Sequence, residues 1–170
     1  RVDENDKELV IDSWMTMEWN DAYLKWDPKE FNNITEMRIP HTEIWKPDLS
    51  IYTSTDDSLF PTSNTLAVLY YHGKVVWVPY FQIKSHCPRQ KKQEKGYFNC
   101  NIRIGSRTYS SNLLNPLLID SEVDLSSFLD INTEWRLENA IIDRVSKYNI
   151  CCFEEYPFIN FKIILERRVI

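Results

Sequence analysis

The chain has 170 residues, of which 43% are hydrophobic and 14% aromatic, and it carries a formal net charge of −5. This length suits one domain with a sizeable core and is short for two ordinary domains. The acidic balance argues against nucleic acid as a partner, because proteins that bind it favour strongly basic surfaces. No run of ~20 apolar residues, the length that crosses a bilayer, occurs in this sequence.

Apolar positions alternate along the first half of the chain. Leu9–Trp19 predicts a strand, and Tyr23–Trp26 predicts a second apolar segment that ends in a turn. Thr65–Tyr71 and Lys74–Val78 lie on either side of His72-Gly73. Two apolar runs around such a turn predict a β-hairpin.

The second half of the chain continues this pattern. Asn101–Ile104, Trp135–Val145 and Phe158–Leu165 are further predicted strands, and the last alternates strictly between two faces. Asp120–Phe128 favours a loop over a short helix. Many short strands separated by turns predict an all-β fold, a two-sheet antiparallel sandwich of the immunoglobulin-like type with about ten strands.

Four cysteines give an even count, which fits a disulfide framework in an oxidising compartment. A bridge between Cys87 and Cys100 would contribute ~3 kcal/mol through chain entropy. Cys151 and Cys152 are adjacent, so their Cα atoms lie only ~3.8 Å apart, closer than the ~4.4–6.8 Å of ordinary disulfides. Two interpretations remain for this pair, a strained vicinal disulfide or two buried reduced cysteines.

Asn33 begins the sequon Asn33-Ile34-Thr35, which is an acceptor for glycosylation in secreted chains. Together with the cysteines, it favours an extracellular location and the vicinal disulfide over reduced cysteines. Tyr148 and Tyr156 lie close to the cysteine pair in sequence, whereas aromatic residues such as Trp14 and Tyr52 lie far from it. Each aromatic residue by itself is more often part of a core than of a binding site.

Several sequence blocks, in order, resemble the nicotinic acetylcholine receptor family and its soluble acetylcholine-binding proteins. The blocks are Trp14–Asp21 with Leu24–Pro28, Ile44–Leu49 with Tyr52, Pro79 with Lys84–Cys87, Ile102–Tyr109, and Cys151–Tyr156. The resemblance implies that residues 1–170 form one ligand-binding domain, without the N-terminal helix and first strand of the family. It also implies that Cys87 bonds to Cys100 and Cys151 to Cys152, the latter pair marking an alpha-type subunit.

The family is pentameric, and the resemblance implies a ligand site at each boundary between subunits. The principal face would supply Tyr52, Arg107, Tyr148, Cys151, Cys152 and Tyr156. The complementary face would supply Trp14, with Val68, Val76 and Val78 as an apolar wall. Aromatic ring faces attract a quaternary ammonium by ~0.5–2 kcal/mol per contact, and the capping loop at the cysteine pair excludes water.

The sequence departs from the family pattern at three places. Arg107 stands where the family has the central tryptophan of this aromatic box. Asn149 stands where the family has a tyrosine, and Tyr148 is one place earlier, which on a strand points to the opposite face. The loop between Cys87 and Cys100 is polar and has the twelve-residue length of the soluble binding proteins, and it lacks the aromatic-Pro-aromatic-Asp core of channel subunits.

Arg107 allows two hypotheses. The favoured one is an ion pair with Glu154 or Glu155 on the capping loop, and the other is an altered ligand preference for an anion. Either way we expect weak acetylcholine binding by an assembly of this subunit alone, because a fixed cation repels an ammonium and one ring is lost.

Three functional classes follow from these observations. The chain is expected to bind a small ligand as part of a homo- or hetero-pentamer, either in a channel subunit or in a secreted binding protein. A channel would contact the membrane only through a pore domain that this chain does not contain, and a run of ~20 apolar residues after Ile170 would identify it. A structural subunit without ligand is the second class. An enzyme is the least favoured, because His41, His72 and His86 are scattered, and no cofactor or metal is expected.

Overall fold

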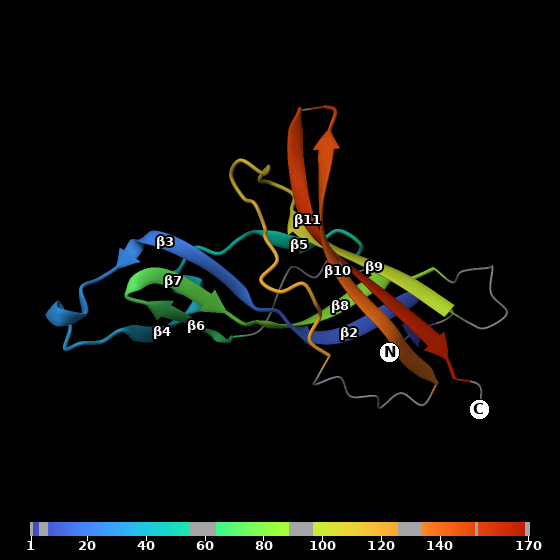
Figure 1. The fold of residues 1–170 in the computed structure, drawn as a ribbon, viewed down its shortest axis with the longest axis horizontal. Coiled ribbons are helices and arrows are strands. Elements are labelled where there is room, and N and C mark those ends of the chain that lie inside the picture. The colour runs from blue at the N-terminus through green and yellow to red at the C-terminus, as the bar shows by residue number, and fades with distance from the viewer. Residues whose placement is uncertain are drawn as a thin grey trace. The chain divides into compact units, whose positions relative to one another are not determined.

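The computed structural model describes residues 2–3, 7–54, 64–88, 97–125, 134–151 and 153–168, and Figure 1 shows them to be built mainly of strands. The strands are β1 Val2–Asp3, β2 Glu8–Trp14, β3 Met17–Lys25, β4 Glu36–Pro40, β5 Leu49–Ile51, β6 Leu66–Tyr70, β7 His72–Trp77, β8 Tyr80–His86, β9 Tyr97–Ser106, β10 Trp135–Asn149 and β11 Glu154–Arg167. Two short 3₁₀ helices, η1 Pro28–Glu30 and η2 His41–Glu43, complete the described elements. Within the described residues, no helix has the length and apolar character needed to cross a membrane.

The chain divides into two compact units. The first comprises residues 1–11, 47–60 and 83–170, and the second comprises residues 12–46 and 61–82. The strands form three sheets, with the orders β1-β2-β8, β10-β11-β9-β5 and β3-β7-β6-β4. The strand pairs with a recorded register are all antiparallel, so the predicted all-β antiparallel fold class is confirmed.

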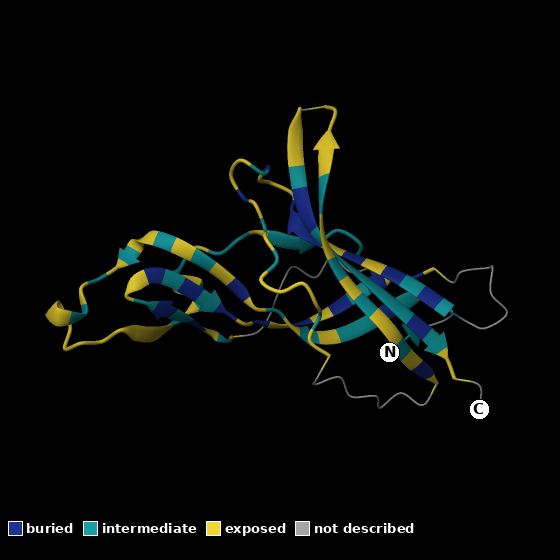
Figure 2. Cartoon of the chain, viewed as in Figure 1, coloured by how far each residue is buried: buried dark blue, intermediate teal, exposed yellow. Residues whose placement is uncertain are grey.

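The sheet of the first unit is dominated by the long β10–β11 hairpin, which carries β9 and β5 beside it (Figure 1). In β9 the residues Phe98, Cys100, Ile102 and Ile104 are buried, whereas Asn101 and Arg103 between them are exposed (Figure 2). This two-residue period gives the sheet one core face and one face that reaches solvent. The candidate site is built on the second of these faces.

The predicted bond between Cys87 and Cys100 is present, with Cα atoms 4.8 Å apart. Both cysteines are almost fully buried, and Cys100 lies on the core face of β9. The polar loop that the sequence analysis placed between them, residues 89–96, lies outside the described residues.

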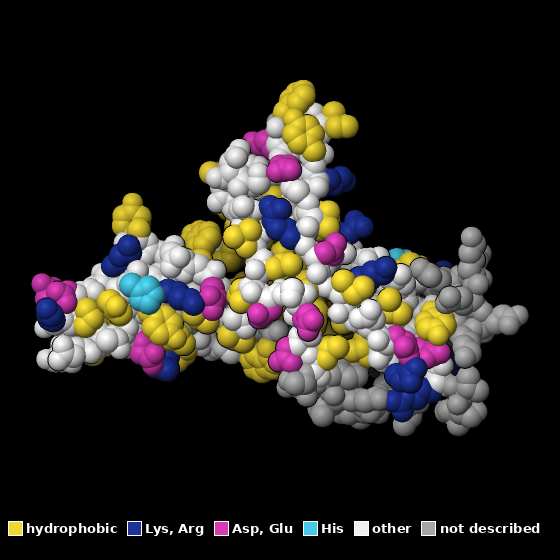
Figure 3. Space-filling view, viewed as in Figure 1, with side chains coloured by type: hydrophobic (Ala, Val, Ile, Leu, Met, Phe, Trp, Pro, Cys, Tyr) yellow, Lys and Arg dark blue, Asp and Glu magenta, His cyan; other side chains and the backbone are white. Residues whose placement is uncertain are grey.

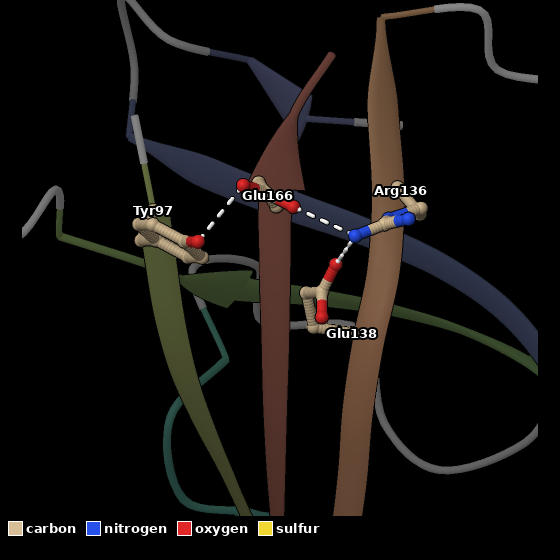
Figure 4. A network of polar contacts seen from close by, with 4 residues as sticks. All are labelled: Tyr97, Arg136, Glu138 and Glu166. Atoms are coloured by element: carbon tan, nitrogen blue, oxygen red, sulfur yellow. Dashed lines mark hydrogen bonds and ion pairs between the residues drawn. The ribbon is translucent and has the colours of Figure 1, made fainter. Parts of the chain in front are cut away.

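A polar network ties the end of this sheet that is remote from the β10–β11 turn (Figure 4). The Tyr97 hydroxyl donates to Glu166 at 2.8 Å, and Arg136 donates to the other oxygen of Glu166 at 2.9 Å and to Glu138. Tyr97 opens β9, Arg136 lies near the start of β10, and Glu166 lies near the end of β11. The network therefore joins three neighbouring strands at one end of the sheet.

The second unit contains the predicted hairpin, as β6 and β7 pair antiparallel. The last recorded pair of this hairpin is Leu69 with Val75, which centres the turn on the predicted His72-Gly73, and His72 pairs with Lys25 of β3. Gly73 has a φ of +90°, and a Cβ there would collide with the carbonyl oxygen of Asp21. Both facts require glycine at this position.

The prediction of one strand over Leu9–Trp19 is wrong, because β2 ends at Trp14 and β3 begins at Met17. Between them, the backbone N–H of Met15 donates to the carbonyl of Pro79 at 3.2 Å. The apolar pattern continues through this break, so alternation alone does not locate it. Residues 120–125 contain no helix, as predicted, and the rest of the predicted loop lies outside the described residues.

Candidate functional site

Tyr52 follows β5 directly and lies on the solvent-reaching face of the first unit's sheet. Its hydroxyl donates to the backbone carbonyl of Ser106, and its ring centroid lies 5.9 Å from that of Phe158. Burial raises the pKa of the Tyr52 hydroxyl, an effect that the charge of Arg107 opposes. A half-buried ring with its hydroxyl engaged presents its face, rather than its polar end, to a ligand.

Gly105 makes this placement of Tyr52 possible. A Cβ at Gly105 would lie 2.9 Å from the Phe158 Cβ, from the Pro157 carbonyl oxygen and from the Tyr52 hydroxyl. The register pairs Gly105 with Phe158 on one side and Ser50 on the other, so three strands converge on this position. Sequence analysis included Gly105 only within a motif, because its close contacts come from residues distant in sequence.

Arg107 places its guanidinium carbon 5.4 Å from the centroid of the Tyr52 ring. This is a cation–π distance, so the ring face that could receive a ligand cation already carries one from the protein. No ion pair joins Arg107 to Glu154 or Glu155 in the part of the chain that the structure describes, so the favoured pairing hypothesis is wrong for this conformation.

The register of the β10–β11 hairpin explains why that pairing is missing. Tyr148 pairs with Glu155, which puts Glu155 on the face opposite to Tyr156. Glu154 lies on the same face as Tyr156 and accepts a hydrogen bond from its hydroxyl at 3.1 Å. This hydrogen bond raises the pKa of Tyr156. One carboxylate thus faces away from Arg107, and the other is engaged locally.

The same register places Tyr148 and Asn149 on opposite faces of the hairpin, with Asn149 on the face of Tyr156. Tyr148 is 55% exposed and lies with Ile150 and Phe153 near the hairpin tip, where Figure 3 shows hydrophobic side chains gathered. Cys151 is exposed and takes part in a disulfide. Cys152, its expected partner, lies outside the described residues, so that bond stays a prediction.

The residues expected on the complementary face all belong to the second unit. Val68 and Val76 are direct cross-strand partners on β6 and β7, and Val78 follows β7 on the same side as Val76. The row continues to Glu18 beside Val76 and to Arg38 beside Val68. The expected apolar wall is therefore bordered by one acidic and one basic side chain.

Trp14 is 62% exposed and has a neighbour that sequence analysis did not identify. The Tyr80 ring packs edge-on against Trp14 with centroids 5.3 Å apart. Asp12 accepts hydrogen bonds from the Tyr80 hydroxyl at 2.8 Å and from Gln82 at 2.9 Å. These bonds, with that from Gln82 the stronger influence, lower the pKa of Asp12. Through the Tyr80 hydroxyl, Asp12 thus fixes the Tyr80 ring that packs against Trp14.

Asn33 is exposed in the turn after η1, in a left-handed conformation with φ of +60°. Its backbone N–H donates to the Pro28 carbonyl at 2.7 Å, and its side chain is free to meet solvent. This position is compatible with the predicted glycosylation, which stays a prediction.

The structure therefore brings Tyr52, Arg107 and Tyr156 to one face of the first unit's sheet, and places Trp14 and the three valines in the second unit. Lys147, which pairs with Tyr156 across the hairpin, joins the first set and was missed. The signal for it was the two-residue period, since Lys147 and Asn149 share a face. Among the described residues, no group of three or more His, Cys, Asp or Glu side chains is placed to hold a metal ion.

Comparison with known proteins matches residues 1–169 to the neurotransmitter-gated ion-channel ligand binding domain family. The chain is 34% identical to neuronal acetylcholine receptor subunit alpha-4 of Gallus gallus, over 98% of the chain and 27% of that protein. It is 33% identical to acetylcholine receptor subunit alpha-like 2 of Drosophila melanogaster, over 97% of the chain and 30% of that protein. It is also 33% identical to acetylcholine receptor subunit alpha-type acr-16 of Caenorhabditis elegans, over 99% of the chain and 34% of that protein. The chain thus spans about a third or less of the length of these relatives.

Proposed function

Because the chain belongs to the neurotransmitter-gated ion-channel ligand-binding domain family, we propose that it binds a small ligand outside the cell, at the boundaries between subunits of a pentamer. The relatives are named as acetylcholine receptor subunits of alpha type, which supports ligand recognition rather than catalysis as the role of this domain. Tyr52, Arg107 and Tyr156, with the cysteine pair, would form the principal side. Trp14 and the valine row would form the complementary side of the next subunit.

The observation that carries this proposal is the convergence of Tyr52, Arg107 and Tyr156 on one solvent-reaching face. The charges of Arg107 and of Tyr156 both act on the Tyr52 hydroxyl, although the three residues lie far apart in sequence. Trp14 is largely exposed and Tyr52 is half-buried, so part of each ring lies outside the packed core. Exposed aromatic rings held by specific partners favour a recognition role over a packing role.

Acetylcholine is a poor fit to this arrangement. Arg107 is exposed, so its repulsion of an ammonium ~4 Å away lies nearer the ~1 kcal/mol of bulk water than the ~4 kcal/mol of a partly buried pair. The missing tryptophan ring removes a further ~1–2 kcal/mol of cation–π attraction. A total of ~2–3 kcal/mol corresponds to an affinity roughly 30- to 100-fold lower than that of a complete aromatic box.

A binding screen on the assembled domain tests the proposal, with cholinergic agonists beside anionic transmitters. Saturable binding that is lost on both Tyr52→Ala and Trp14→Ala supports a site composed of both sets of residues. Binding that survives either substitution would contradict the proposed site, because each set supplies at least one essential ring.

A structural subunit that binds no ligand is the second candidate. The position of Arg107 over Tyr52 favours it, because the protein's own cation already occupies the ring face. The same screen separates the two functions: a structural subunit assembles into a ring but binds nothing in the screen. In either case the subunit belongs to a channel or to a soluble assembly, and the gene sequence beyond residue 170 distinguishes these.

A further inference from the structure

Two cations lie on the face of the sheet that carries Tyr52 and Tyr156. Lys147 is the direct partner of Tyr156 across the β10–β11 hairpin. Arg107 directly follows the end of β9, and its guanidinium carbon lies 5.4 Å from the centroid of the Tyr52 ring, on which the charge of Tyr156 also acts. Neighbouring strands lie ~4.7–4.9 Å apart, so the Lys147 side chain starts beside Tyr156, and Arg107 lies over the nearby Tyr52 ring.

Neither cation is neutralised by a carboxylate. Across the described ranges of the chain, no ion pair involves Lys147, Arg107 or Arg103, which lies over the Phe158 ring on the same face. The carboxylates of this face are engaged elsewhere, because Glu154 accepts from Tyr156 and Asp143 accepts from the Asn160 amide at 2.9 Å.

Asp48 is the remaining nearby carboxylate. Its charge acts on Tyr52, yet it forms no ion pair with Arg107 or Lys147 in the described structure. Within the described residues, neither Arg107 nor Lys147 is therefore held in an ion pair.

We propose that this site takes a small ligand that carries a carboxylate. Arg107 would bind the carboxylate through the planar donors of its guanidinium, and Lys147 on β10 would add a second positive charge. The Tyr52 ring beneath the guanidinium holds Arg107 in place for this contact. The inference rests on the proposed function and names the ligand class of that same site.

Titration calorimetry on the assembled domain tests the inference with succinate, 4-aminobutyrate and acetylcholine as probes. We expect succinate to bind more tightly than acetylcholine. Arg107→Gln and Lys147→Gln should each weaken succinate binding by about tenfold or more, because each removes a charge-assisted contact. Arg107→Lys keeps the charge but loses the planar fork, so its affinity should fall between those of the unmodified domain and Arg107→Gln.

Lys162→Gln is the matched control. Lys162 lies on the same face of β11, six residues from Tyr156 and hence ~20 Å away along the strand. The Lys162→Gln substitution removes the same positive charge as Lys147→Gln but far from the site, so succinate affinity should change less than twofold. An equal loss with Lys162→Gln and Lys147→Gln would overturn the local contact in favour of a general field.

The outcomes distinguish this inference from the proposed function. Acetylcholine binding without succinate binding would overturn the carboxylate inference and leave the proposed function standing. No binding of any probe, in a domain that assembles, would overturn the inference and favour the structural subunit.

Discussion

The guanidinium carbon of Arg107 lies 5.4 Å from the centroid of the Tyr52 ring, on a face where no carboxylate among the described residues forms an ion pair with Arg107. The ring and the cation come from segments that pair as β5 and β9. This relationship combines an aromatic ring and a fixed cation in one place. The ring face of Tyr52 that could attract a ligand cation therefore already carries a cation of the protein.

Gly105→Ala should destabilise the domain by about 1–3 kcal/mol, the usual cost of overpacking. The added methyl would meet Phe158, Pro157 and Tyr52 at 2.9 Å, and two of these contacts involve atoms that cannot rotate away. Thermal unfolding measures the loss, with Asn101→Ala as the control because Asn101 is exposed on the same strand. Equal melting temperatures for the two variants would contradict the close packing at Gly105.

Tyr80→Phe should weaken ligand binding about threefold while leaving stability within ~0.5 kcal/mol of the unmodified domain. The substitution keeps the ring against Trp14 but removes the hydroxyl that donates to Asp12. Calorimetric titration with the tightest probe of the screen measures this effect. Tyr23→Phe, at a 97% exposed tyrosine, is the matched control, and an equal response in both variants would mean that Asp12 does not position the Trp14 neighbour.

Acid should weaken the polar network around Glu166 at the end of the sheet. The hydrogen bond from Tyr97 is the main cause that lowers the pKa of the Glu166 carboxyl, and the Arg136 guanidinium contributes. A lowered pKa in the fold gives stabilisation that is complete above the ordinary value of about 4.3 and is lost as pH falls through the folded value.

Glu166→Gln should therefore destabilise the domain at neutral pH, and this disadvantage should shrink as pH falls below about 4.3 and through the lowered pKa of Glu166. Denaturant unfolding at pH 7 and at pH 3.5 measures the difference for each protein. Glu122→Gln, at an exposed glutamate, is the control and should show no such change. A pH-independent difference between Glu166→Gln and the unmodified domain would refute the linkage.

Removal of the Cys87–Cys100 disulfide with paired serine substitutions should cost about 2–5 kcal/mol. The bond closes a separation of 13 residues, and both cysteines are buried. Denaturant unfolding of the double variant measures this cost. A midpoint equal to that of the unmodified domain would mean that the staple is dispensable.

Sequence patterns predicted the strand content well, because alternating burial leaves a clear two-residue period in segments such as Phe158–Leu165. They failed at the boundary between β2 and β3, where the apolar pattern continues and a tertiary hydrogen bond from Met15 to Pro79 accompanies the break. Such a boundary depends on a partner more than sixty residues away. No local pattern contains that information.

For the candidate site, the period of the strands correctly separated Tyr148 from Asn149, and the structure places them on opposite faces. The absence of the predicted ion pair between Arg107 and Glu154 or Glu155 could not be foreseen, because it depends on cross-strand register and on the competing hydroxyl of Tyr156. The support of Trp14 by Tyr80 and Asp12 also joins strands distant in sequence. Residue types alone identified candidate site residues, whereas the strand register determines which residues lie beside them.

The most direct test of the role of Arg107 is acetylcholine titration, by calorimetry, of the assembled domain and its Arg107→Trp and Arg107→Met variants. Arg107→Met removes only the charge, whereas Arg107→Trp also restores a ring. We predict weak or absent binding by the unmodified domain, a partial gain for Arg107→Met, and a total gain of roughly 30- to 100-fold for Arg107→Trp. Tight acetylcholine binding by the unmodified domain, or no gain in Arg107→Trp, would contradict the placement of Arg107 in the binding site.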